Sequence, residues 1–319
     1  MKRMLICTLS AVLLYMLPVT VRAEETLIPV GKIVGLQLRS GNLTVVAYDE
    51  NLGTNARASG LKIGDEILTI EDQSVTCAEE VRSALQNCSG RIRLTVRREG
   101  IKQALTLETV PTADGRRLGI YLRQGIAGIG TVTFYNPETG LFGTLGHGVC
   151  DGKGRLLEMT DGSAYEASIA SVKKGRSGDP GQLKGSAGNE IGTLLRNTPQ
   201  GVFGVNQTGW PGQPLPVADY EEIRPGSACI RATVCGESPQ EYSVEILRIY
   251  PEDRSDGRNF LLNVTDPRLL EATGGIVQGM SGSPIIQDGK LVGAVTHVLV
   301  NDPQRGYGIF IENMLEAAQ

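Results

Sequence analysis

The chain has 319 residues, of which 40% are hydrophobic, and its 31 Lys and Arg against 35 Asp and Glu give a formal net charge of -4. This length is enough for two domains of ordinary size. The acidic balance, with no long basic cluster, argues against a nucleic-acid-binding protein. The two histidines, His147 and His297, stand far apart in sequence. That spacing does not suggest zinc, and we expect neither a metal nor another cofactor.

The first 23 residues have the pattern of an export signal. Lys2 and Arg3 precede an apolar stretch from Met4 to Val21, and Val21-Arg22-Ala23 offers a small-x-small cleavage site. The stretch is near the lower length limit for crossing a membrane, so the segment is either removed or kept as an anchor. The cysteines after it are spaced in ways that do not suit bridging, and we expect free thiols.

The segment Ala58–Ile70 resembles the part of a PDZ domain that forms a short helix, a turn, here at Gly64-Asp65, and a strand. A helix over 78–86 and an alternating, half-buried strand over 91–98 follow. This succession resembles a PDZ domain, which we place at residues 31–110. By the same resemblance, Val34, Gly35 and Leu36 belong to the loop and strand that receive a peptide. Such a peptide adds a strand to the sheet edge, and loop N–H groups hold its carboxylate.

From residue 111 onward the chain shows short β-prone runs separated by Gly, Pro, Asn and Asp. Examples are 119–122, 130–135, 190–195 and 240–250. Such spacing favours an all-β barrel or sandwich. A helical pattern returns at 311–318.

Near the C-terminus the chain reads Gly279-Met280-Ser281-Gly282-Ser283-Pro284. The form Gly-x-Ser-Gly-small-Pro surrounds the nucleophile of chymotrypsin-type serine proteases, in which the N–H groups of Gly279 and Ser281 would form the oxyanion hole. A plain Gly/Ser/Pro turn is the alternative. Two apolar strands, 284–286 and 291–295, follow the motif and favour a nucleophile turn that enters a β-hairpin.

A serine nucleophile needs a base, and His147 is the stronger of the two histidine candidates. Glycines flank it, which favours an open loop. The segment between it and the serine is long enough to form a whole barrel. His297 lies within an apolar strand, where we expect it to line a pocket wall.

The residue pattern does not identify which carboxylate would orient the base. Asp151, Asp179, Asp253, Asp256 and Asp266 are candidates. Asp179 is typical of a turn, and Asp253 and Asp256 lie in a charged segment. Residue patterns alone leave Asp151 and Asp266 open, and Asp266 could equally be the N-cap of a helix that starts at Pro267.

A family resemblance favours Asp266. The runs 263–267, 273–284 and 293–298, together with Leu145-Gly146-His147, Gly128–Thr131 and Lys174–Gly181, resemble the stage IV sporulation protein B peptidases of endospore-forming bacteria. Carried over by motif, the triad is His147, Asp266 and Ser281. The acid stands only fifteen positions before the serine, unlike in ordinary chymotrypsin-like proteases.

The resemblance implies a mostly β protein, with a signal or anchor at 1–23, a PDZ domain at 31–110 and a chymotrypsin-like double β-barrel at 111–319. It implies an exported serine endopeptidase that acts in the intermembrane space around the forespore. Its substrates would be itself and a membrane-bound regulator of an intramembrane metalloprotease, and a PDZ peptide ligand would be a further partner. The alternatives are an inactive PDZ scaffold and a general envelope quality-control protease.

Overall fold

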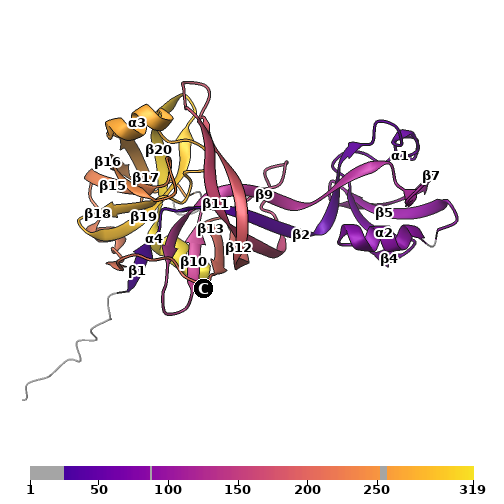
Figure 1. Cartoon of the computed structure of the whole chain (residues 1–319), viewed down its shortest axis with the longest axis horizontal. Coiled ribbons are helices and arrows are strands. Elements are labelled where there is room, and N and C mark those ends of the chain that lie inside the picture. Colours follow the sequence, from indigo (N-terminus) through magenta and orange to yellow (C-terminus); the bar gives the residue numbers. More distant parts are fainter. Residues whose placement is uncertain (1–24, 87, 252–256) are drawn as a thin grey trace, which may run out of the picture.

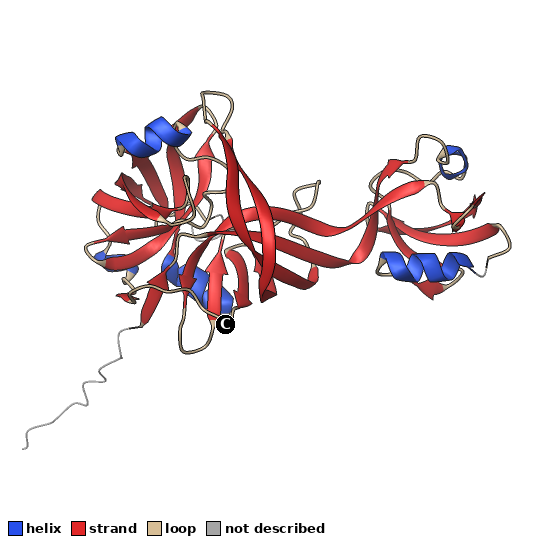
Figure 2. Cartoon of the chain, in the orientation of Figure 1, coloured by secondary structure: helices blue, strands red, loops and turns tan. Residues whose placement is uncertain are grey.

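The computed structural model describes residues 25–86, 88–251 and 257–319. Two β-rich bodies of unequal size are joined by a pair of long strands (Figure 1), and short helices sit at their margins (Figure 2). The mostly β class predicted from the sequence is confirmed. No helix among the described residues is long and apolar enough to cross a membrane. The predicted signal or anchor at residues 1–23 lies outside the described part of the chain.

The first barrel belongs to the larger body and closes through a ring of six strands. Each strand is hydrogen-bonded to the next, and the pairing of β2 with β9 closes the ring. Val34, Leu36, Leu38, Val132 and Phe142 contribute to its buried core. In ring order the strands are β9 (Ile120–Tyr135), β10 (Leu141–Thr144), β13 (Gly201–Val205), β12 (Gln182–Thr198), β11 (Met159–Lys173) and β2 (Ile33–Tyr48). Short strands β1 (Thr26–Pro29) and β14 (Leu215–Pro216) extend this sheet beyond β9.

The second barrel is a closed ring of six antiparallel strands. Phe260 and Phe310 meet edge to face at its centre, with ring centroids 4.8 Å apart. In ring order the strands are β15 (Gly226–Ala232), β16 (Gln240–Ile249), β17 (Phe260–Val264), β20 (Asp302–Phe310), β19 (Lys290–Leu299) and β18 (Pro284–Gln287). Helices α3 (Pro267–Thr273) and α4 (Ile311–Ala318) and the 3₁₀ turn η1 (Tyr220–Glu222) complete this half. The predicted hairpin after Ser281 is β18–β19, and the predicted C-terminal helix is α4.

The smaller body, residues 43–122, has a hydrophobic core of its own that includes Leu43, Ile67, Ile92 and Leu107. The helix predicted over 78–86 and the strand over 91–98 are both present. Its elements are α1 (Thr54–Ala58), β3 (Glu66–Ile70), β4 (Gln73–Ser74), α2 (Ala78–Gln86), β5 (Arg91–Arg98), β6 (Ile101–Glu108), β7 (Val110–Thr112) and β8 (Gly115–Arg117), with the adjoining ends of β2 and β9. That this body is a PDZ domain stays a prediction.

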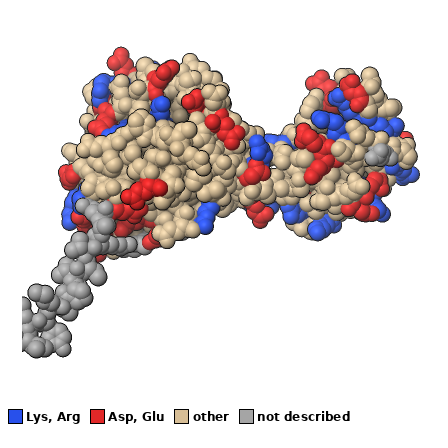
Figure 3. All heavy atoms as spheres, turned by 60° about the horizontal axis from the view of Figure 1, so that its bottom comes forward, with Lys and Arg blue, Asp and Glu red and all other residues tan. Residues whose placement is uncertain are grey.

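Acidic and basic side chains are interspersed on the face of the smaller body seen in Figure 3. Two ion pairs of the smaller body join Arg97 to Glu66 and Arg98 to Asp65, which is only 1% exposed. Asp65 also accepts from the N–H of Lys62. A buried carboxylate with a guanidinium and an N–H partner fixes the predicted Gly64-Asp65 turn.

Strands β2 and β9 run through both bodies. In the first barrel the two strands pair from Ile33 opposite Thr131 to Leu38 opposite Ile126. The register then shifts, and in the smaller body pairing resumes from Leu43 opposite Gln124 to Tyr48 opposite Ile120. Gly125 occupies the crossing with φ +86°, where a Cβ would lie 1.8 Å from the carbonyl oxygen of Leu38. The smaller body is therefore inserted into the first barrel, and the predicted boundaries at residues 31 and 110 do not coincide with it.

The predicted peptide-receiving residues Val34, Gly35 and Leu36 lie in the barrel and not in the smaller body. They pair with Gly130, Ile129 and Gly128 of β9 on one side. On the other side β11 pairs with the same three residues. Because both edges are occupied, this segment cannot accept a further strand, and the prediction is wrong for these residues.

Candidate active site

The Ser281 turn is pressed against the first barrel. Gly279 and Gly282 have φ values of +99° and +95°, which side chains rarely adopt. A Cβ on Gly282 would lie 2.0 Å from the carbonyl oxygen of Thr131 and 2.5 Å from the N of Leu145. The glycines of the motif are therefore required by backbone conformation and by close approach of the other barrel.

Thr131, on β9, ties the Ser281 turn to the segment that leads to His147. Its N–H donates to the carbonyl of Ser281 (2.9 Å), and its Oγ1 donates to the carbonyl of Gly279 (2.8 Å). Its own carbonyl accepts from the Oγ1 of Thr144 (2.6 Å) and the N–H of Leu145 (3.3 Å). Thr131 is 1% exposed. The sequence offered no signal for this role beyond the presence of Thr131 in one of the resembling runs.

Ser281, Gly279 and His147 line one cavity of about 530 Å³ between the two barrels. The hydroxyl of Ser281 donates to the carbonyl oxygen of Thr296 on β19 (2.7 Å). Among the described residues, nothing accepts a hydrogen bond from the N–H of Gly279 or of Ser281. Both N–H groups are thus available to an oxyanion formed beside Ser281.

His147 follows β10 in a tight turn. Gly146 before it has φ +68°, and a Cβ there would lie 2.9 Å from the Cγ2 of Thr296. The Nδ1 of His147 lies 3.0 Å from the carbonyl oxygen of Gly148. A carbonyl only accepts, so this contact requires the proton on Nδ1 and leaves Nε2 as an acceptor. Burial lowers the pKa of His147 below its ordinary value, which favours the neutral imidazole that a general base requires.

His297 lines the same cavity from β19, as expected. Its ring centroid lies 5.0 Å from that of His147, with the planes inclined by 35°.

Asp266 lies elsewhere, as the N-cap of α3. Its carboxylate accepts from the N–H of Arg268 (2.9 Å) and of Ser243 (3.2 Å), and the guanidinium of Arg268 lies 2.8 Å away. The Arg268 guanidinium holds the pKa of this 5% exposed carboxyl well below its usual range. None of these partners is His147. The predicted triad is not assembled, and Asp266 adopts the capping role that the residue pattern had left open.

The other described carboxylate candidates do not orient His147 either. Asp151 accepts from the N–H groups of Lys153 and Arg155 and from the Arg155 guanidinium. Asp179 pairs with Lys173. Asp253 and Asp256 lie outside the described residues. Within the described residues, the only polar partner of the His147 ring is Gly148.

The tip of the β11–β12 hairpin is hydrogen-bonded to the segment that precedes Ser281. The N–H of Gly175 donates to the carbonyl of Thr273 (2.7 Å). The N–H of Leu183 donates to the carbonyl of Gln278 (2.8 Å), whose own N–H donates to the carbonyl of Gly181 (3.3 Å). Pro180 of the same tip lines the cavity. The first barrel therefore supplies part of the wall around Ser281.

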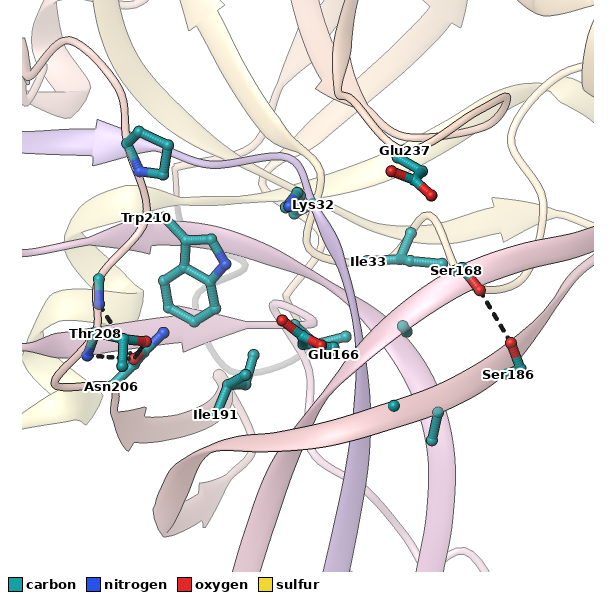
Figure 4. A pocket seen from close by; sticks show the side chains of 16 residues that line it. Lys32, Ile33, Glu166, Ser168, Ser186, Ile191, Asn206, Thr208, Trp210 and Glu237 are labelled. Atoms are coloured by element: carbon teal, nitrogen blue, oxygen red, sulfur yellow. Dashed lines mark hydrogen bonds between the residues drawn. The ribbon is translucent and has the colours of Figure 1, made fainter.

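A second cavity, of about 390 Å³, opens beside Trp210 (Figure 4). It is lined by Lys32, Glu166 and Glu237 together with the hydrogen-bonded pair Ser168 and Ser186. It contains neither histidine nor Ser281, so it is separate from the candidate active site.

The smaller body has a groove of about 400 Å³ between α2 and the start of β9. Val81 and Leu85 of α2 line one side, and Leu118–Leu122 the other. The charged residues beside them are of both signs: Asp49, Arg82, Asp114, Arg116 and Arg117. Within the described residues, Ile120–Leu122 pairs only with β2, so one of its edges is open.

Two solved structures are similar to this chain at low identity. The inactive form of the Rv3671c protease is 16% identical, with a TM-score of 0.36, over 60% of this chain and 82% of that chain. The active form, from M. tuberculosis, is 16% identical, with a TM-score of 0.37, over 61% of this chain and 73% of that chain. No curated protein matches this chain. The family model for SpoIVB peptidase S55 matches residues 114–315, and the chain belongs to this family of serine peptidases.

Proposed function

We propose that the protein is an exported serine endopeptidase with Ser281 as nucleophile and His147 as base. The observation that carries this proposal is that Ser281, His147 and Gly279 line one cavity, and that no described residue accepts from the N–H groups of Gly279 and Ser281. A neutral imidazole and free oxyanion donors are what acyl transfer to serine requires.

In the proposed reaction, the Ser281 hydroxyl leaves the carbonyl of Thr296 and donates to the Nε2 of His147. Its oxygen attacks the peptide carbonyl while His147 takes the proton, and the N–H groups of Gly279 and Ser281 bind the oxyanion. His147 then protonates the leaving amine. Water, activated by the same ring, releases the acyl group and restores the serine hydroxyl. Among the described residues, the carbonyl of Gly148 is the group that fixes the tautomer of His147.

We further propose the biological setting that the resemblance implies. The substrate is a membrane-bound regulator of an intramembrane metalloprotease in sporulation signalling. The protein also cleaves itself, outside the cytoplasm and around the forespore. The smaller body acts as a PDZ domain, and the peptide lies between α2 and Leu118–Leu122.

A fluorophosphonate probe, which reacts only with an activated serine, tests the chemistry. The parent should be labelled, and Ser281→Ala should not. Ser283→Ala is the matched control, because the Ser283 hydroxyl is buried and donates to the carbonyl of Met280 (2.7 Å). A parent that is folded but never labelled would refute the proposal.

A PDZ scaffold without activity is the second candidate function. Two observations favour it. The Ser281 hydroxyl is hydrogen-bonded to the carbonyl of Thr296, and the carboxylates of Asp266 and Asp151 are hydrogen-bonded to groups other than His147. The same labelling experiment separates the two functions, because an inactive scaffold leaves Ser281 unlabelled in the parent.

A further inference from the structure

The walls of the cavity beside Ser281 are mostly apolar. Leu36 and Leu38 of β2, Ile129 of β9, Val277 before the serine and Val298 of β19 all line it. Its described lining residues include no Asp, Glu, Lys or Arg. The lining polar side chains are those of His147, His297, Ser281, Thr296, Gln278 and Cys150.

Part of this apolar wall is left uncovered. Val300 at the rim is 50% exposed, and Ile129 and Val298 are half-buried. Contiguous apolar side chains that stay in contact with water around a cavity are typical of a surface that a ligand covers.

We propose that this cavity selects large apolar side chains in the substrate segment that flanks the scissile bond. This inference rests on the proposed function, because it names the substrate class of the same site. An aliphatic or aromatic side chain that enters the cavity removes its own apolar surface and that of the wall from water. A charged side chain would lose its hydration and meet no opposite charge among the described lining residues.

The volume also favours large residues. About 530 Å³ lies within the range of about 300–1,000 Å³ found for ligand pockets. In an apolar pocket, each methylene changes kcat/KM by roughly 10- to 200-fold. Peptides with Leu, Phe or Met beside the scissile bond should therefore exceed those with Ala or Gly by at least about ten-fold. The hairpin tip keeps the pocket wall in place, because Pro180 is flanked by hydrogen bonds from Gly178 to Val300 and from Gln278 to Gly181.

The test uses the full-length protein and a proteome-derived peptide library, with cleaved bonds mapped by mass spectrometry. Ser281→Ala serves as the blank for contaminating proteases, and fluorophosphonate labelling of the same preparation reports the nucleophile. We expect Leu, Phe, Met, Ile or Val to be enriched at a position next to the cleaved bond.

The variant Val298→Asp places a carboxylate in the cavity wall. It should lower kcat/KM for the preferred apolar peptides at least about ten-fold and shift the preference toward Lys or Arg. Val46→Asp is the matched control, because Val46 is 36% exposed on the part of β2 that lies in the smaller body. This control should keep the parental preference.

The outcomes separate this inference from the proposed function. A labelled parent that prefers acidic, basic or small residues overturns the inference alone. So does a labelled Val298→Asp variant with unchanged preference. A folded parent without labelling overturns the proposed function and the inference with it.

Discussion

Replacing Thr131 with Val removes the hydroxyl that holds the Ser281 turn and nearly preserves the shape of the side chain. The bond from Oγ1 to the carbonyl of Gly279 is 2.8 Å long and partly buried. Leaving such a carbonyl without its donor costs about 1–2 kcal/mol. For a domain of this size, that corresponds to a fall in Tm of about 2–8 °C.

The same change should reduce catalysis, because the hydroxyl fixes the peptide between Gly279 and Met280, next to the proposed oxyanion donors. We expect kcat to fall about ten-fold, short of the 10²–10³-fold loss that follows removal of a whole donor. KM should change little, since Thr131 is buried and does not line the cavity. Thr131→Ser keeps the hydroxyl and should recover most of kcat.

Thr109→Val provides the control for stability. Thr109 is 2% exposed, lies in the smaller body and donates to the carbonyl of Gly90 at 2.7 Å. The same hydroxyl also accepts from the Nε of Arg116 at 2.6 Å. Calorimetry should therefore show a fall in Tm at least as large, with kcat on a peptide substrate unchanged. Parental kcat in Thr131→Val, or an equal loss of kcat in both variants, would refute the reasoning.

Three further changes follow from the site. Gly282→Ala should give little folded protein and no probe labelling, because the new Cβ would meet Thr131 and Leu145 backbone atoms at 2.0 and 2.5 Å; a well-folded, labelled variant would contradict this. The kcat/KM should rise with pH, with a midpoint below the ordinary His pKa of about 6.5, because burial lowers the pKa of His147; a midpoint above about 6.5 would be inconsistent. The buried neutral ring also contributes to the stability of the fold: this contribution is complete above about pH 6.5 and is lost as the pH falls through the folded pKa. Asp266→Asn should lower the unfolding free energy by about 1–3 kcal/mol at pH 7. The difference from the parent should begin to shrink below about pH 4, where the unfolded parent takes up a proton, and should be lost as the pH falls through the lowered pKa of the folded carboxyl. Because Asp266 caps α3, turnover by the folded variant should stay within about ten-fold of the parent, and a loss approaching the 10⁴-fold typical of a triad acid would return it to the catalytic machinery.

The local features around Ser281 could be predicted from sequence because they depend on neighbouring residues. Glycines at positive φ, a following proline and two apolar runs determine the turn and the β18–β19 hairpin. Asp266 shows the opposite case. An Asp-Pro pair is compatible both with an N-cap and with a carried-over triad acid, and only the positions of Arg268 and Ser243 in space distinguish the two.

The course of β2 could not be predicted for a related reason. Apolar alternation continues along the strand on both sides of the crossing near Gly125, yet the neighbours change from β9 and β11 to β9 and β3. Alternation identifies a strand and its buried face but carries no information about which sheet it joins. The role of Thr131 was hidden in the same way, because its partners lie far away in sequence.

The passage of β2 and β9 through both bodies limits how this chain can be shortened. A fragment that starts at Pro111 lacks β1 and β2. Because β2 is one of the six strands of the first barrel, this fragment cannot close that barrel. A cut within the smaller body would leave β2 on one piece, still paired with β9 and β11 on the other. Such a nicked protein would give two bands on a denaturing gel and one particle in solution. Proteolytic trimming from the N-terminal side that keeps both barrels whole must therefore cleave ahead of β2.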